Sequence, residues 1–388
     1  MSELQRLLRE DLRGRTAYGA PQLEVPVALN TNESSYGVPA DVVAAIVERV
    51  EAVAGSLNRY PDREFTTLRA DLAEYLTTTT GVDVPVEQVW AGNGSNEVLQ
   101  HIVQAFGGPG RIALGFTPSY SMHPIISRVA GTTWVDGLRS ADPSDPAQPA
   151  DRAARPAQTR FDVDTDLAVA QCREHDPHVV FLTSPNNPTG TALDLSVVEA
   201  VYEAAPDAIV VVDEAYAEFA RPGTPSALTL LAGRPRLVVT RTMSKAFAFA
   251  GVRLGYLAAD PELVDILRLV RMPYHLSSVT QAVACAALEH RTAMLAMVEA
   301  IKAERDRLVD GCAALGLDPV PSDANFVLVG GFDDAAATWQ ALLDQGVLVR
   351  DVGIAHHLRI TAGTPSETDA VLAALAAVQT ATPRQETA

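Results

Sequence analysis

The chain has two side-chain amines that could take part in covalent chemistry, those of Lys245 and Lys302. Lys245 stands in the stretch RTMSKAFAFAG, between small and aromatic residues. Burial among such neighbours lowers the pKa of an ammonium group and favours the neutral, nucleophilic amine. Lys302 lies in the charged helical pattern IKAERDR, which is typical of a solvent-facing residue. Lys245 is therefore the candidate for covalent chemistry, and a surface lysine with an exposed amine is the alternative interpretation.

Groups that suit a phosphate occur in two places. Ser244 directly precedes the lysine and Arg253 follows it eight residues later, and both side chains can bind phosphate oxygens. In WAGNGSNEVLQ a strand ends in a glycine-bearing loop, and we expect a helix to begin at Ser95 or Asn96. The backbone N–H groups and the dipole at a helix N-terminus favour an anion. A simple N-cap would explain the same residues, and the spacing matches neither a P-loop nor G-x-G-x-x-G.

Two further polar groups follow predicted strands. Asp213 ends the apolar run AIVVVD, with Tyr216 three residues later, and Asn187 lies in the turn SPNNPTGT after HVVFLT. A buried carboxylate needs a cation or a donor opposite it, and a protonated pyridine nitrogen would serve. Ligands of open α/β sheets bind at the carboxyl ends of strands, where these residues would lie. Helix capping by the aspartate and plain turn chemistry are the alternatives.

Arginines mark the C-terminal part of the chain. Arg350 and Arg359 lie in VLVRDVGIAHHLRITAGT and could together clamp an anionic substrate, unless both are simply exposed. His356 and His357 are adjacent, so in an extended segment they point in opposite directions. No acidic residue or cysteine stands at ligand spacing from them, and we expect no metal site there.

The elements that must position these residues alternate between helix and strand from about residue 60. This alternation predicts an α/β fold, with a large domain built on a mainly parallel sheet and a smaller α+β domain. The predicted division is an N-terminal arm over 1–36, the large domain over 37–275 and the small domain over 276–388, which part of the arm joins. Residues 139–160 are rich in Pro, Ala, Asp and Arg and are predicted to form a mobile surface loop.

Composition limits the class of protein. The 388 residues carry 30 basic and 48 acidic side chains, a net charge of −18, so we expect no nucleic-acid partner. The three cysteines are far apart, which argues against a disulfide framework or structural zinc. The N-terminus lacks an apolar signal region and no apolar run approaches the roughly 20 residues of a membrane span. A cytoplasmic enzyme is expected.

The order of the motifs resembles a known family. N-P-T-G, then D-E-A-Y, then S-K with an arginine eight residues later, is similar to the class I/II aminotransferases of fold type I, which depend on pyridoxal 5′-phosphate (PLP). Within that class the chain is most similar to the actinobacterial histidinol-phosphate aminotransferases. The similarity covers nearly the whole chain and is carried by YGAPQLEVPVALNTNE, LNRYPD, NGSNEVLQ, PSYSMHP, FLTSPNNPTG, VVVDEAYAEF, RTMSKAFAFAGVRLGY, SDANFVL and LRITAGT.

The resemblance implies roles around the cofactor ring. Lys245 would form the Schiff base and move the substrate proton, and Asp213 would pair with the pyridinium nitrogen. Tyr216 and Asn187 would contact the phenolic oxygen, and Tyr120 would stack on the ring. Lys245, Asp213 and Tyr216 are thereby the implied catalytic residues.

The resemblance also implies binding sites and a dimer. The cofactor phosphate would be held by a set of polar residues: Ser95, Asn96, Ser244 and Arg253. Tyr60 would reach the phosphate of the neighbouring subunit's cofactor, which makes the active unit a homodimer. The substrate would meet Tyr18, Asn32, Arg350 and Arg359.

The implied reaction converts histidinol phosphate and 2-oxoglutarate to imidazole acetol phosphate and L-glutamate, a step of histidine biosynthesis. The alternatives are an aromatic or specialised-metabolite aminotransferase and a PLP-dependent phospho-amino-acid decarboxylase. They stay open because the chain has Asn32-Glu33-Ser34-Ser35-Tyr36 where the family commonly has N-E-N-P and an aromatic. His123 likewise stands near a position where relatives often have an aromatic residue.

Overall fold

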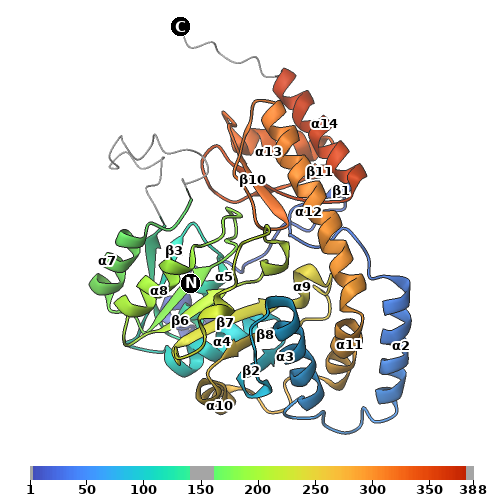
Figure 1. Cartoon of the computed structure of the whole chain (residues 1–388). Coiled ribbons are helices and arrows are strands. Elements are labelled where there is room, and N and C mark those ends of the chain that lie inside the picture. The colour runs from blue at the N-terminus through green and yellow to red at the C-terminus, as the bar shows by residue number, and fades with distance from the viewer. Residues whose placement is uncertain (1–2, 140–160, 382–388) are drawn as a thin grey trace.

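The central sheet has seven strands in the order β2-β8-β7-β6-β5-β3-β4. The computed structural model describes residues 3–139 and 161–381 (Figure 1). Strands β3 to β7 run parallel, and β8 is antiparallel to both β2 and β7. The mainly parallel sheet of the prediction is confirmed. Its strands are β2 (Val89–Gly92), β3 (Ile112–Thr117), β4 (Thr133–Leu138), β5 (Val179–Thr183), β6 (Ile209–Asp213), β7 (Leu237–Thr242) and β8 (Gly255–Ala259).

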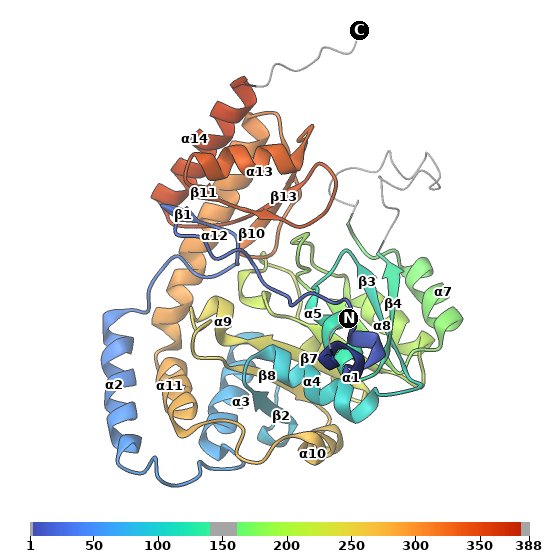
Figure 2. The same ribbon diagram turned by 180° about the vertical axis from the view of Figure 1, so that it is seen from behind.

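Helices cover both faces of this sheet (Figures 1 and 2). Every residue of β5, β6 and β7 is buried, because parallel strands between two helical layers have no solvent face. Side chains set the helix starts: Asp164 accepts from the Leu167 amide, and Asp260 precedes a proline at the first turn. The helices are α2 (Ala40–Ala54), α3 (Thr66–Thr80), α4 (Ser95–Phe106), α5 (Met122–Val129), α7 (Thr165–His175), α8 (Leu195–Ala204), α9 (Met243–Ala246), α10 (Pro261–Val270) and α11 (Ser278–Glu289).

A second sheet lies in the C-terminal part of the chain. Its four antiparallel strands have the order β12-β13-β10-β9: β9 (Asp318–Pro319), β10 (Phe326–Gly330), β12 (Arg350–Asp351) and β13 (Leu358–Thr361). Three helices accompany it: α12 (Arg291–Ala314), α13 (Ala335–Asp344) and α14 (Pro365–Ala381). We call this part the small domain. The exact boundary at residue 275 stays a prediction, since α11 still packs against α2 and α3.

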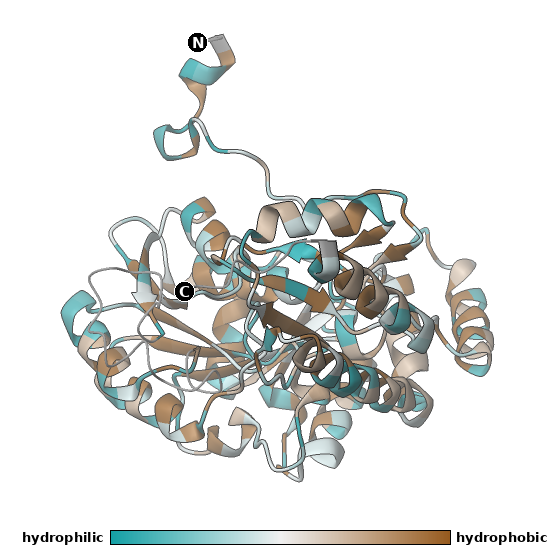
Figure 3. Cartoon of the chain, turned by 90° about the horizontal axis from the view of Figure 1, so that it is seen from above, coloured by the Kyte–Doolittle hydropathy of each residue, from teal (hydrophilic) through white to brown (hydrophobic). Residues whose placement is uncertain are grey.

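The N-terminal arm joins the small domain. Strand β1 (Val27–Ala28) pairs in parallel with β11 (Val347–Leu348), as expected for an arm shared with that domain. The stretch VLVRD forms two short strands, because β11 pairs with the arm while β12 pairs with β13. Ahead of β1, helix α1 (Glu3–Leu7) stands away from the rest of the chain (Figure 3).

The predicted surface loop is wrong at its first residue. Arg139 is 1% exposed, because its side chain turns inward to bind the Thr183 hydroxyl and the Phe161 carbonyl. The rest of that prediction, residues 140–160, lies outside the described residues. The three cysteines are buried and free. Within the described ranges, no helix is long and apolar enough to cross a membrane.

Candidate active site

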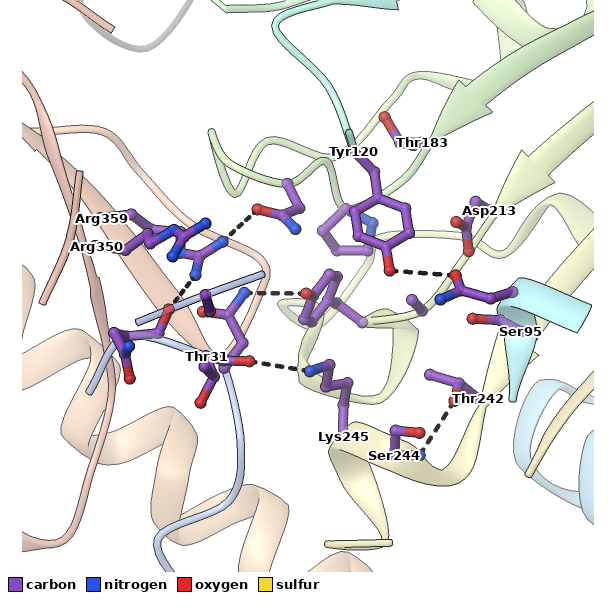
Figure 4. A pocket seen from close by; sticks show the side chains of 18 of the residues that line it. Thr31, Ser95, Tyr120, Thr183, Asp213, Thr242, Ser244, Lys245, Arg350 and Arg359 are labelled. Carbon is purple, nitrogen blue, oxygen red and sulfur yellow. Dashed lines mark hydrogen bonds between the residues drawn. The ribbon is translucent and has the colours of Figure 1, made fainter. Parts of the chain in front are cut away.

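One cavity gathers the predicted site residues at the carboxyl ends of β5, β6 and β7 (Figure 4). The N-terminal arm and the small domain close its other side. All predicted site residues line it except Tyr60: Tyr18, Asn32, Ser95, Asn96, Tyr120, Asn187, Asp213, Tyr216, Ser244, Lys245, Arg253, Arg350 and Arg359. Sequence reasoning missed the other lining residues, which are Ala20, Asn30, Thr31, Thr183, Pro185, Ala215 and Thr242.

Lys245 projects into the cavity from α9, directly after β7. The Thr242 hydroxyl accepts from the Ser244 amide and so starts this short helix. The Lys245 Nζ donates to the Thr31 carbonyl at 3.2 Å (Figure 4). Burial, together with the nearby charges of Arg359 and Arg253 and against the opposing charge of Glu33, lowers the pKa of Lys245 to about 8. The lowered pKa expected from the sequence is confirmed, so a usable fraction of the amine is neutral near pH 7.

Lys302 lies away from this cavity, on α12. Its Nζ pairs with Glu299 at 2.9 Å, one helical turn earlier. The side chain is 16% exposed, less than the solvent-facing prediction implies, and its amine makes an exposed ion pair at the surface.

Asp213 brings a carboxylate to the cavity at the end of β6. It is 4% exposed, and its Oδ1 accepts from the Thr240 hydroxyl at 3.1 Å. Its Oδ2 lies 3.1 Å from Nε2 of His123, whose ring stacks on Phe181 with centroids 4.6 Å apart. Sequence reasoning gave no role to His123, although its place three residues after Tyr120 puts both on the same turn of chain. The carboxylate is thus oriented from two sides and can hold a cationic ring N–H.

Groups that can bind an anion gather where α4 begins, around Ser95, Ser244 and Arg253, and we call this part of the cavity the phosphate seat. The helix starts at Ser95, as predicted, and Gly94 before it has φ = +82°. A Cβ on Gly94 would lie 2.5 Å from Nη2 of Arg253, so the glycine leaves room for this guanidinium. Ser244 lines the same cavity from α9. Helix N–H groups, hydroxyls and one guanidinium together match the oxygens of a phosphate.

Hydrogen-bond donors and aromatic rings line the middle of the cavity. The Tyr120 hydroxyl donates to Asn96 at 3.2 Å, and the Asn32 amide donates to the Tyr216 hydroxyl at 3.0 Å. Burial raises the pKa of Tyr216, so its hydroxyl keeps its proton at neutral pH. Tyr18 lines the rim and is 53% exposed.

Arg359 and Arg350 lie opposite one another on β13 and β12 (Figure 4). Arg359 donates to Asn187 Oδ1 at 2.6 Å and to the Asn30 carbonyl at 2.7 Å. Its Nε is buried and has no hydrogen-bond partner within the described residues. Burial chiefly lowers the pKa of Arg359 to about 10; Tyr216 opposes this shift and Arg350 adds to it. A buried guanidinium with a free donor and a second cation beside it is a site for a substrate anion.

Tyr60 and the histidine pair lie outside this cavity. Tyr60 is 80% exposed and stacks on Tyr274, with ring centroids 4.5 Å apart. The His356 ring lies 2.7 Å from the Phe332 carbonyl, and His357 is buried against Phe161.

The residues present fit PLP. The lowered pKa of Lys245 suits attachment of an aldehyde, Asp213 suits a pyridinium nitrogen, and the seat at α4 suits a phosphate. The free Nε of Arg359 is left for a substrate anion, since the cofactor phosphate has its own donors.

Comparisons with known proteins agree with this geometry. Residues 24–375 match the family model of aminotransferase class I and II. The chain is 58% identical over 381 residues to a histidinol-phosphate aminotransferase of Paenarthrobacter aurescens, covering 97% of this chain and 96% of that protein. A histidinol-phosphate aminotransferase of Thermobifida fusca is 58% identical over 360 residues, covering 93% of this chain and 92% of its own length.

Solved structures show the same fold. The histidinol-phosphate aminotransferase from Sinorhizobium meliloti in complex with PLP aligns with a TM-score of 0.78 at 26% identity, covering 92% of each chain. An aspartate aminotransferase from Thermus thermophilus with maleate aligns with a TM-score of 0.75 at 25% identity, covering 91% of this chain and 92% of that one.

Proposed function

The chain belongs to the aminotransferase class I and II family, and from that premise we propose that it exchanges the amino group of histidinol phosphate with 2-oxoglutarate. The products are imidazole acetol phosphate and L-glutamate, and the reaction serves histidine biosynthesis in the cytoplasm. The chain is an aminotransferase whose cofactor is PLP. The resemblance and the fold class predicted from the sequence are confirmed.

The observation that carries the proposed substrates is the pair Arg350 and Arg359 in one cavity with Lys245. The amino substrates, histidinol phosphate and L-glutamate, each present an amine and at least one anionic group. The free donor of Arg359 and the neighbouring Arg350 can bind either anion while the amine lies near Lys245. The high identity to proteins named histidinol-phosphate aminotransferase supports the same substrates.

We assign the other cavity residues to holding the cofactor. Ser95, Asn96, Ser244 and Arg253 hold its phosphate. Asp213, oriented by His123 and Thr240, keeps a proton on the ring nitrogen. PLP supplies an electron sink for the bond that breaks at the substrate α-carbon.

Lys245 moves the proton. With a pKa of about 8, its Nζ can accept the substrate's α-proton at neutral pH and deliver it again within the cavity. When the cofactor is bound, Tyr216 and Asn187 would donate to its ring oxygen, and Tyr120 would pack over its ring. Tyr216 is buried, and Lys245, Tyr120 and Asn187 are partly buried, which limits the access of water to this part of the cavity.

The active unit is proposed to be a homodimer. Tyr60 is 80% exposed, which leaves it free to reach the phosphate seat of a second subunit. Large apolar side chains are exposed beside it in sequence and on α2 and α10, a pattern typical of an interface: Val43, Val47, Leu57, Leu269 and Met272. Leu4 and Leu7 on the projecting helix α1 are also exposed (Figure 3).

The substrate assignment is tested by comparing acceptors. The loaded enzyme is given L-glutamate with either imidazole acetol phosphate or phenylpyruvate, and kcat/KM is measured for each. We expect a preference for imidazole acetol phosphate of about a hundredfold or more, since the phosphate adds charged hydrogen bonds that phenylpyruvate lacks. A preference for phenylpyruvate would make the chain an aromatic aminotransferase, and release of CO₂ from an O-phosphorylated amino acid would make it a decarboxylase.

A further inference from the structure

Arg139 is a buried cation that the proposed reaction does not use. It follows β4 directly and is 1% exposed. Burial lowers its pKa to about 10, which Asp162 partly offsets, so the guanidinium is charged at neutral pH. Burying a charged group costs free energy unless its donors are hydrogen-bonded. Removing one partner of such a bond leaves the other partner buried without a hydrogen bond. The groups that Arg139 binds therefore indicate why a charged residue is buried at this position.

The first side-chain contact of Arg139 supports the cavity wall. Its Nη1 donates to Oγ1 of Thr183, a lining residue, at 3.3 Å. That hydroxyl donates to Oδ1 of Asn186, and the Asn186 amide donates to the Pro118 carbonyl at 3.0 Å. Asn187, the next residue, accepts from Arg359. This wall thus holds the two loops that carry Tyr120 and Asn187.

The second side-chain contact leads to the small domain. The Arg139 Nε donates to the Phe161 carbonyl at 2.9 Å. The Phe161 ring packs in a buried cluster with Val320 and Leu328 of the small domain. It also lies edge-on to His357, with centroids 5.6 Å apart. Phe161 therefore links the small domain, through its ring, to Arg139, which binds its backbone carbonyl.

The path ends at the substrate arginines. Leu328 on β10 lies opposite Arg359 on β13, and Arg359 lies opposite Arg350 on β12. A shift of the Phe161 ring would move this sheet relative to the cavity wall. Displacements near 1 Å at a substrate-positioning group are enough to reduce reactivity strongly.

We propose that Arg139 is a positioning residue, which fixes the small-domain sheet carrying Arg350 and Arg359 against the cavity wall through Phe161 and Thr183. The inference rests on the proposed function, because it takes those two arginines as the substrate's partners. Arg139 also has a spare donor: its Nη2 is buried and unpartnered in the part of the chain that the structure describes. The fork shape matters, since Arg139 donates to Phe161 and Thr183 from two different nitrogens of a rigid plane, which a lysine's single ammonium does not reproduce.

The test replaces Arg139 by Met and, separately, by Lys. We expect KM for both substrates to rise about tenfold in R139M, with kcat and the cofactor dissociation constant of the apoenzyme changed less than about threefold. R139K keeps the charge and should show most of the KM rise. The matched control is R69M: Arg69 is also buried and donates to the Val86 and Val89 carbonyls, away from the cavity. It should lose stability without the KM effect.

A second readout needs no substrate. The Asp323 amide donates to the Gly190 carbonyl between the small domain and the large sheet, at 2.8 Å. Hydrogen exchange at this amide in the apoenzyme should accelerate in R139M and not in R69M. If R139M does not fold, F161A replaces it, and we expect the same KM rise and faster exchange. Unchanged KM and unchanged exchange in the folded variant would overturn the proposal.

The failure of this inference can be separated from failure of the proposed function. R359Q should raise KM strongly if Arg359 binds the substrate anion. If R359Q leaves KM unchanged, the proposed function is wrong, whatever Arg139 does. If R359Q raises KM while R139M changes neither KM nor exchange at Asp323, only the role of Arg139 is wrong.

Discussion

Lys245 holds an ammonium group where charge is disfavoured. Its pKa falls from 10.5 to about 8, chiefly through burial. This difference corresponds to about 3 kcal/mol, at about 1.4 kcal/mol per pKa unit. The folded apoenzyme is destabilised by that amount as long as the amine is protonated in both the folded and the unfolded state. The same burial makes the amine more reactive, because more of it is neutral.

The first prediction concerns the stability of apo K245M. At pH 7 both folded and unfolded wild type are protonated, so the variant should be more stable by up to about 3 kcal/mol. Above pH 8 the folded lysine releases its proton while the unfolded one still binds it, so wild type gains stability relative to the variant up to about pH 10.5.

Urea unfolding of the two apoenzymes at pH 7 and pH 10 measures this difference. K302M is the control, because Lys302 pairs with Glu299 near the surface and should show a change of about 0.5 kcal/mol or less at both values of pH. If the difference in unfolding free energy between K245M and wild type were the same at pH 7 and pH 10, the lowered pKa of Lys245 would be refuted.

Single functional residues could be predicted from the sequence where the residue type and its neighbours in the chain are enough to identify them. Lys245 could be found because the chain has two lysines with different neighbours. Asp213 and Arg359 could be named as candidates from strand ends and motifs. Arg139 and His123 could not be predicted, since their roles depend on partners such as Thr183 and Asp213 that are far away in the chain.

The start of α4 and strand β8 show how elements form the phosphate seat. Gly255 begins β8, and a Cβ there would overlap the backbone nitrogen of Ser95. The backbones can therefore approach only with glycine at this position. The close approach keeps the first turn of α4 beside Arg253 and Ser244.

The second prediction is that G255A separates these two elements. It should weaken PLP binding to the apoenzyme by about tenfold or more and destabilise the fold by roughly 2 kcal/mol, since backbone must move to admit the methyl group. Fluorescence titration with PLP and thermal unfolding measure the two effects. G251A is the matched control, because a Cβ there meets no heavy atom within 4 Å in the described structure. Equal affinities for PLP in the two variants would contradict the close approach.

The elements themselves were largely predictable. The helix over SNEVLQHIVQAF and the strands HVVFLT and AIVVVD occur as expected, because periodicity and strand-end residues are local signals. The break between β11 and β12 was not predictable, since it follows from pairing with an arm more than 300 residues earlier. The sequence-based loop over 139–160 failed at Arg139, because the side chain is buried by hydrogen bonds to Thr183 and Phe161 that no local pattern reveals.

On the scale of the whole molecule, the chain closes its cavity from three parts: the large sheet, the arm and the small domain. Tyr60 is the predicted site residue that its own cavity does not use. If a second subunit receives it, each site depends on two chains.

The third prediction uses that dependence. K245A lacks the amine, and Y60A lacks the tyrosine offered to the partner. In a mixed dimer, the Y60A subunit keeps Lys245 and receives Tyr60 from the K245A subunit, so one complete site forms. After denaturation and joint refolding with PLP, activity should reach roughly a quarter of wild type if subunits pair at random. Activity no greater than the sum of the separate variants would contradict a shared site.

The central claim is that Lys245 is the amine to which PLP attaches. Reduction of the loaded enzyme with borohydride, followed by proteolysis and mass spectrometry, finds the modified lysine directly. We expect the cofactor's mass on the peptide that contains Lys245 and an unmodified Lys302. Cofactor on the Lys302 peptide, or on no peptide of an enzyme that still transaminates, would contradict it.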